Sequence, residues 1–179
     1  MDAPEHPALA GHFVVVMRRN FPRLVGRTAY ERALDLMLED QRDQVLSTTS
    51  VGWLPITTLD AFHYAVAEAT GSDAVELTRE LVDMNIQDTI RGVWRIAVKA
   101  ATDRMLIKKA PTFYSRSYNV GEATSRLLGD GRAEMTVSGW PEMSPFTLPS
   151  LDVAIVRLLE HAGRRDVTST SELTPDGGR

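Results

Sequence analysis

The 179-residue chain contains no cysteine and no long apolar segment. Without cysteine, disulfides, zinc–thiolate sites, iron–sulfur clusters and thiol nucleophiles are all excluded. The longest apolar run, residues 13–17, is far shorter than the roughly 20 residues that a membrane-spanning helix needs. Residues 1–12 lack the basic segment and apolar core of a signal peptide. We therefore predict no membrane span and, by elimination, a cytoplasmic location.

Sequence motifs of catalysis are missing as well. The four histidines (His6, His12, His63 and His161) are scattered and show no metal-ligand spacing, so a structural role is the better interpretation for each. There is no nucleophile elbow, phosphate-binding loop or dinucleotide fingerprint. Gly129-Asp130-Gly131 has the spacing of a turn and no following helix. We predict a protein that is not an enzyme and holds neither a metal nor a cofactor.

Composition and periodicity predict a helical first part. A hydrophobic content of 43% and a charged content of 25% are typical of one globular domain, here residues 1–179 with a loose lead-in over 1–10. A buried helix is expected to start within residues 11–17, with a short strand as the alternative. Further helices are expected over 28–46 with a capping box from Thr28 to Glu31, over 57–70 closed by Gly71, and from Ser72 onward to 102 with a break near Gly92.

The period of the apolar residues changes in the second part. A short helix over 105–110 is expected to stop before Pro111, because proline disfavours helical geometry in the residue before it. Residues 123–127 and 133–137 then alternate about the glycine turn, which predicts a β-hairpin. A helix over 147–163 and an alternating strand over 166–173 follow, and the turn at 175–178 suggests a last strand cut short after 178. The predicted fold class is α+β, with a helical part followed by hairpin, helix and hairpin around an antiparallel sheet packed on helices.

Basic residues are concentrated in one part of the chain. Residues 91–116 contain seven basic residues and one acid, Asp103, whereas residues 68–88 are acidic. Two solvated faces that attract each other are the better interpretation of this pattern, and the functional alternative is a basic helix face that docks an acidic protein partner or an anionic ligand. Nucleic acid is not expected, because the net charge is −4 and no recognition motif is present. The candidate docking residues are Arg91, Arg95, Lys99, Lys108 and Lys109.

Aromatic residues gather between the two parts. They would either seal the helices against the sheet or line an apolar cavity in which Arg116 and two tyrosine hydroxyls are the polar groups. The candidate pocket residues are Trp94, Phe113, Tyr114, Arg116, Tyr118 and Trp140.

Several short segments, taken together, resemble a known family. GHFVVV at 11–16, WLPI at 53–56, LVDMN at 81–85, APTFYSRSY at 110–118, the hairpin and the helix 151–163 follow one another as in an uncharacterised myxobacterial family. That family is similar to the haem nitric-oxide-binding (H-NOX), four-vinyl-reductase and transport-particle domains. The resemblance spans roughly residues 11–178 and implies an α+β ligand-binding domain.

The haem chemistry of that group is not matched here. No histidine occurs between His63 and His161, where the resemblance would place the haem ligand. Tyr114, Ser115 and Arg116 have the residue types of the propionate-binding Y-x-S-x-R motif at the wrong spacing, and the cysteines of the metal-binding relatives are absent. The resemblance therefore implies a haem-less domain.

Two functions are compatible with these features. The first is a non-catalytic sensor or signalling module, expected to be homodimeric, in which a small apolar or anionic ligand in the cavity biases a dimer or partner surface. The alternative is a structural adaptor that binds no small molecule and docks a protein partner through its basic helix face.

Overall fold

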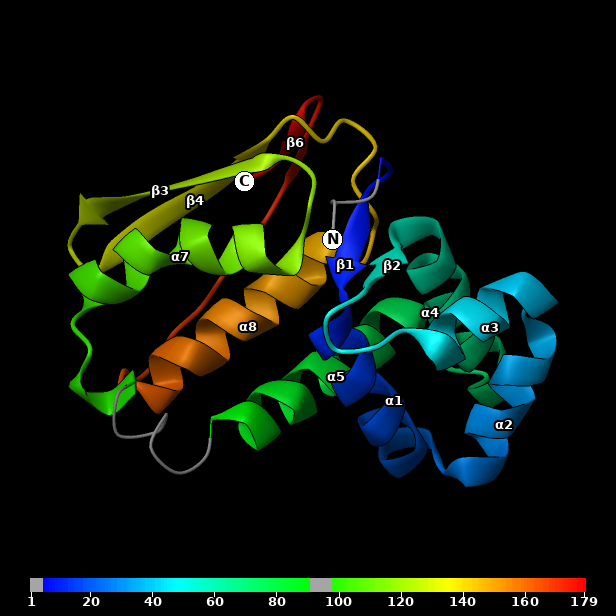
Figure 1. Cartoon of the computed structure of the whole chain (residues 1–179). Helices are drawn as coiled ribbons and strands as arrows, with labels where there is room; N and C mark the ends of the chain where they lie inside the picture. The colour runs from blue at the N-terminus through cyan, green and yellow to red at the C-terminus, as the bar shows by residue number, and fades with distance from the viewer. Residues whose placement is uncertain (1–4, 91–97) are drawn as a thin grey trace. The chain divides into compact units, whose positions relative to one another are not determined.

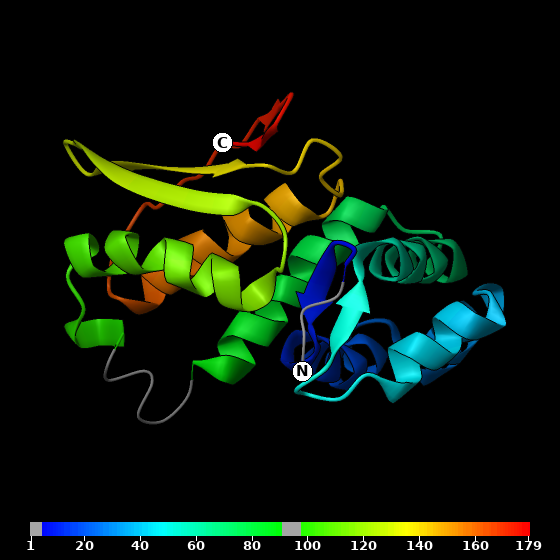
Figure 2. The same ribbon diagram turned by 45° about the horizontal axis from the view of Figure 1, so that its top comes forward.

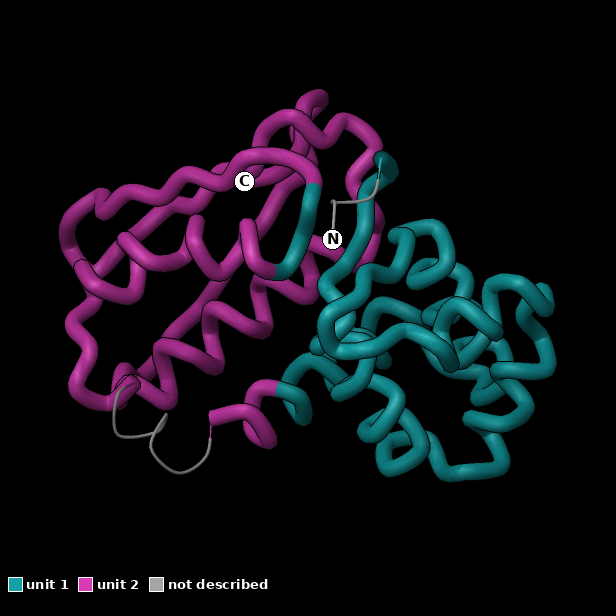
Figure 3. The backbone as a smooth tube through the Cα atoms, in the orientation of Figure 1, with its two compact units in different colours: residues 1–85, 117–119 teal, residues 86–116, 120–179 magenta. Residues whose placement is uncertain are grey.

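The computed structural model describes residues 5–90 and 98–179, and the chain forms two compact units (Figures 1 and 3). Unit 1 comprises residues 1–85 and 117–119, and unit 2 comprises residues 86–116 and 120–179. The predicted α+β fold class is confirmed. The prediction of a single domain stays a prediction.

Unit 1 is a helical body with a small two-stranded sheet. Its elements are β1 (Ala8–Ala10), α1 (Gly11–Val25), α2 (Arg27–Leu36), α3 (Glu39–Ser47), β2 (Trp53–Pro55), α4 (Ile56–Thr70) and most of α5 (Ala74–Thr89). β1 pairs antiparallel with β2, and Leu9 also forms a bridge to Tyr118. The helix predicted to start in residues 11–17 is confirmed as α1. The loose lead-in is wrong for 8–10, because these residues are buried and paired.

The core of unit 1 is closed around large side chains of α1 and α4. Phe21 packs edge-on against Phe62 with 4.9 Å between ring centroids, and both side chains are fully buried. The His63 ring, on α4, also lies edge-on to Phe21. Such edge-to-face geometry is favoured by the quadrupole of aromatic rings. Other fully buried large side chains of unit 1 are Val14, Asn20, Val45, Leu54, Val66, Thr78 and Leu81.

The single helix predicted over 28–46 is wrong, since the chain breaks it after Leu36. Met37 has an extended backbone (φ −80°, ψ 156°) and buries its side chain, while α3 starts in a new direction at Glu39. The guanidinium of Arg18 then donates to the carbonyls of Val45 and Leu46 at the end of α3. The apolar pattern that is continuous in the sequence is therefore divided between two short helices, and each helix buries its own face.

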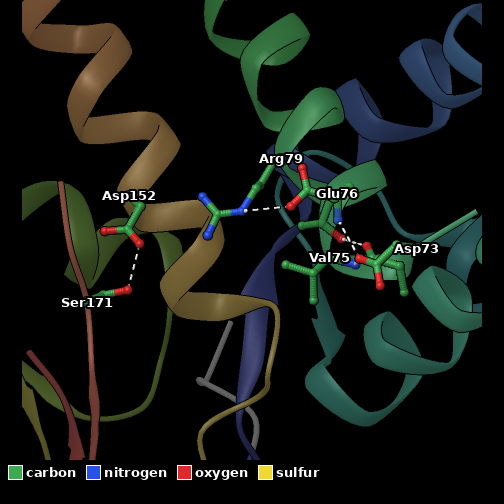
Figure 4. A network of polar contacts seen from close by, with 8 residues as sticks. Asp73, Val75, Glu76, Arg79, Asp152 and Ser171 are labelled. Carbon is green, nitrogen blue, oxygen red and sulfur yellow. Dashed lines mark hydrogen bonds and ion pairs between the residues drawn. The ribbon is translucent and has the colours of Figure 1, made fainter. Parts of the chain in front are cut away.

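The predicted helix ends are partly correct. The capping box from Thr28 to Glu31 is wrong: Thr28 lies inside α2, and no side chain caps that helix. Gly71 ends α4 in the left-handed conformation (φ 68°), as predicted. The cap of α5 is Asp73 rather than Ser72, because the Asp73 carboxylate accepts the backbone N–H groups of Val75 and Glu76 at 2.9 and 3.0 Å (Figure 4). The predicted break near Gly92 lies outside the described residues.

Unit 2 places two helices on one side of an antiparallel sheet (Figures 1 and 2). Its elements are α7 (Asp103–Ser117), β3 (Glu122–Gly129), β4 (Arg132–Ser138), α8 (Thr147–His161), β5 (Leu173–Thr174) and β6 (Gly177–Gly178), and the strand order is β3-β4-β6-β5. The predicted hairpin is confirmed, with Ala123 opposite Val137 and Asp130 at φ 51° in the turn. The predicted hairpin–helix–hairpin order is confirmed as well.

The prediction that a helix stops before Pro111 is wrong, because α7 continues through this residue to Ser117. A proline inside a helix has no N–H to donate to the carbonyl four residues earlier, which is that of Ile107. In this fold the Ser125 hydroxyl, on β3, donates to the Ile107 carbonyl at 2.6 Å. The strand thus supplies the hydrogen bond that the proline removes, so the carbonyl is satisfied and the helix can continue.

The segment after α8 differs from the predicted strand over 166–173. Only Leu173 and Thr174 form a strand there, and the returning strand is already Gly177–Gly178, which also pairs with Val137. Ser169 and Ser171 instead donate their hydroxyls to the two carboxylate oxygens of Asp152 on α8 at 2.6 Å (Figure 4 shows the bond from Ser171). Glu172 exchanges two backbone hydrogen bonds with Arg179, and the hydrogen bonds to the Asp152 side chain hold residues that precede it.

Candidate docking surface on helix α7

Helix α7 has one buried face and one exposed face. Leu106 and Tyr114 are buried, and Ile107 and Ala110 are half-buried. The exposed positions recur every three or four residues, which places them along one side of the helix. We call this exposed face the α7 stripe. It consists of Met105, Lys108, Lys109, Thr112, Phe113 and Arg116.

Three contacts fix the rotation of α7 and hence the direction of the stripe. The Tyr114 hydroxyl donates to the Val120 carbonyl at 2.9 Å, next to Gly121, whose φ of 70° favours glycine. The bond from Ser125 to the Ile107 carbonyl holds the middle of the helix. At its start, Asp103 pairs with the Arg164 guanidinium at 2.5 Å. These contacts all use the buried face or the first residue, so none of them covers the cations of the stripe.

The stripe combines positive charge with exposed apolar area. Met105 is 58% exposed and Phe113 is 49% exposed. Lys108, Lys109 and Arg116 are exposed, and no carboxylate among the described residues lies within ion-pairing distance of them. A surface with both properties would gain free energy by covering its apolar groups and by meeting an anionic group.

The predicted pocket residues differ in burial and belong to both units. Tyr114 and Trp140 are buried in unit 2, whereas Tyr118 is buried in unit 1, where it bridges to Leu9. Phe113 and Arg116 lie on the exposed face of α7, and Trp94 is outside the described residues. The Tyr114 hydroxyl, expected to face a ligand, bonds to the backbone instead. The interpretation of these residues as the wall of one cavity therefore gains no support from their placement.

Three of the predicted docking residues, Lys99, Lys108 and Lys109, are exposed in unit 2, and Arg91 and Arg95 lie outside the described residues. The sequence reasoning missed Met105 as a surface residue. Its spacing of four from Lys109 and eight from Phe113 could have indicated a shared face, but the helix was expected to end before Phe113.

His63 is a buried residue of the unit 1 core. The Thr78 hydroxyl donates to the Ala74 carbonyl, so it accepts a hydrogen bond from Nδ1 of His63, and Nδ1 carries the ring proton. Loss of hydration on burial lowers the pKa of His63 to about 4, and the ring is therefore neutral at physiological pH. A buried neutral histidine bound to a threonine fits the structural role expected from the sequence.

The described residues offer neither a metal-binding cluster nor a membrane-spanning helix. No three or more histidine, aspartate or glutamate side chains in residues 5–90 and 98–179 are placed to hold a metal ion. Over the same ranges, no helix is both long enough and apolar enough to cross a membrane.

Comparison of the chain with protein-family models, with curated proteins and with solved structures finds no match. The resemblance to H-NOX-like domains therefore stays a prediction based on short sequence segments. The function has to be argued from the chemistry of the surface itself.

Proposed function

We propose that the chain is a non-catalytic, cytoplasmic interaction module that docks an acidic protein partner through the α7 stripe. The observation that carries this proposal is the exposure of Met105 and Phe113 among the cations of one helix face. Buried apolar anchors supply most of the affinity of protein interfaces, and rim charges select the partner and speed association.

The charge of the stripe favours an acidic partner. Lys108, Lys109 and Arg116 project from the same face as the two apolar side chains, and the described part of the chain offers them no carboxylate. A partner segment with carboxylates spaced between leucines or other apolar residues would match both features. Placing a cation opposite these lysines would cost free energy and would exclude basic partners.

The placement of the junction residues supports docking better than it supports a small-molecule sensor. The hydroxyl of Tyr114 bonds to Val120, and Phe113 and Arg116 belong to the outer face of the helix. Ligand sensing through a cavity, the first hypothesis from the sequence, stays a prediction.

The proposal can be tested with a defined probe. The probe is a fluorescein-labelled helical peptide that carries glutamates between regularly spaced leucines, and its binding is followed by fluorescence anisotropy. We expect binding to weaken as salt is raised, because screening reduces the attraction between exposed charges. We expect the K108E/K109E variant to bind the peptide roughly tenfold more weakly or worse, since like charges would then face each other.

A matched control separates the stripe from the net charge. Arg132 and Arg165 are exposed cations of unit 2 outside the stripe, so R132E/R165E changes the charge of the chain by the same amount. This variant should bind the peptide nearly as well as the unmodified chain. Equal loss of binding in both variants, or binding that does not respond to salt, would overturn the proposal.

A further inference from the structure

A second surface, on unit 1, has the opposite charge and a similar apolar content. Where the chain breaks between α2 and α3, Leu36 is 44% exposed and Leu38 is 66% exposed. Four exposed carboxylates lie at neighbouring positions of the two helices. We call this set the α2–α3 surface, and it consists of Asp35, Leu36, Leu38, Glu39, Asp40 and Asp43.

The break between α2 and α3 has one buried residue between the two exposed leucines. Met37 is buried in unit 1 in an extended backbone, whereas Leu36 at the end of α2 and Leu38 just before α3 are exposed. Along α3, Glu39, Asp40 and Asp43 are spaced three and four residues apart and share a face. The described residues provide no ion-pair partner for any of the four carboxylates. The result is a segment that exposes four carboxylates and two leucines.

We infer that the acidic partner of the α7 stripe is the α2–α3 surface of a second copy of this chain. The inference rests on the proposed docking function and identifies the acidic partner as a second copy of the chain. Each surface offers two exposed large apolar side chains, Met105 and Phe113 on one and Leu36 and Leu38 on the other. The cations of the stripe meet the carboxylates of the second copy, and the apolar groups cover each other.

The net charges of the two units also favour contact between unit 1 of one copy and unit 2 of another. Unit 1 contains 7 basic and 13 acidic residues and so carries −6, whereas unit 2 contains 13 basic and 11 acidic residues and carries +2. Opposite net charges on the two units draw unit 1 of one molecule toward unit 2 of another. The attraction is long-ranged at low ionic strength and weakens with salt.

The contact joins two different surfaces, so it is heterologous. Each molecule has one of each kind, and a pair can close if both contacts form at once; otherwise copies add in a row or a ring. The expected homo-oligomer is therefore one whose size depends on concentration and on salt.

Sedimentation velocity over a range of protein concentrations tests the inference. The chain should associate at low salt and dissociate at high salt. Two charge-reversal variants, K108E/K109E on the stripe and D35K/D43K on the opposite surface, should each stay monomeric, with the dissociation constant raised roughly tenfold or more by like-charge contacts. Asp35 and Asp43 are preferred to the residues at the start of α3, where acids stabilise the helix through its dipole. Circular dichroism shows whether each variant is folded.

The decisive sample is an equimolar mixture of the two variants. Each variant alone opposes like charges, but in the mixture the acidic stripe of the first faces the basic surface of the second. The remaining pair of surfaces is unmodified. We expect the mixture to recover association that neither variant shows alone. Loss of association in both variants without recovery in the mixture overturns the inference, as does a chain that is monomeric at every concentration. A monomeric chain that still binds the acidic peptide leaves the docking function standing and removes only the second copy as its partner.

Discussion

The two units of this chain bury their apolar residues to different degrees. In unit 1 the rings of Phe21 and Phe62 and their neighbours are fully excluded from water. In unit 2 the apolar positions of α8 from Leu151 to Leu159 are all half-buried, and α7 exposes Met105 and Phe113. Both units follow the same rule that a helix buries one stripe, and unit 2 has its own buried side chains, such as Trp140 and Phe146. The difference therefore lies in the helices of unit 2, whose apolar faces are less enclosed than that of α4, while each unit still exposes apolar side chains that a partner can cover.

The largest expected effect is the loss of an aromatic side chain from the closed core. Replacing Phe62 with alanine should lower the free energy of unfolding by about 3–5 kcal/mol, because the substitution removes buried area and leaves a cavity. Replacing the half-buried Leu158 of α8 with alanine should lower the free energy of unfolding much less, by on the order of 1 kcal/mol. Urea denaturation followed by circular dichroism measures both. Equal costs would show that the two units are packed alike.

A second effect comes from the pH. The pKa of His63 is about 4 in the fold and about 6.5 in the unfolded chain, so the unfolded chain binds more protons between these values. Stability from this residue is complete above pH 6.5 and falls as the pH falls toward 4, where the loss is about 3 kcal/mol. Urea denaturation at a series of pH values should show this slope, and H63N should flatten it. An unchanged slope in H63N would assign the pH dependence to other groups.

The hydrogen bond from Ser125 to the Ile107 carbonyl predicts a smaller loss of stability, whose size should depend on whether Pro111 is present. Replacing Ser125 with alanine leaves the Ile107 carbonyl without its hydroxyl partner and should cost about 1–2 kcal/mol. In a P111A background the new backbone N–H can bond to the same carbonyl, so S125A should then cost less. A double-mutant cycle of unfolding free energies measures the coupling. Strict additivity would mean that the serine does not compensate for the proline.

The smallest effect on stability is expected at the α7 stripe itself. Lys108 and Lys109 are exposed and have no described ion-pair partner, so K108E/K109E should change the unfolding free energy by no more than about 0.5 kcal/mol. The same variant should have a large effect on peptide binding. A marked drop in its melting temperature would instead assign these lysines a role in the fold.

Local patterns in the sequence were enough to predict much of the fold but little of the candidate site. The alternation around Gly129 to Gly131 was enough to predict the hairpin, and Gly71 was correctly read as a helix end. What failed depended on contacts distant in sequence. Ser125 lies 18 residues from the carbonyl that it satisfies, so nothing near Pro111 revealed that the helix continues. The same error hid the α7 stripe, because Met105 and Phe113 share a face only if the helix runs through the proline.

The most direct test of the docking surface is the methyl NMR signal of Met105. The chain contains seven methionines, of which Met105 is exposed on the stripe and Met17 is buried in unit 1. With methyl-labelled methionine, and with M105L to assign the signal, the acidic peptide is titrated into the protein. We predict that the Met105 signal shifts in proportion to binding while the Met17 signal stays in place. Binding of the peptide without a shift of Met105 would contradict the assignment of α7 as the docking surface.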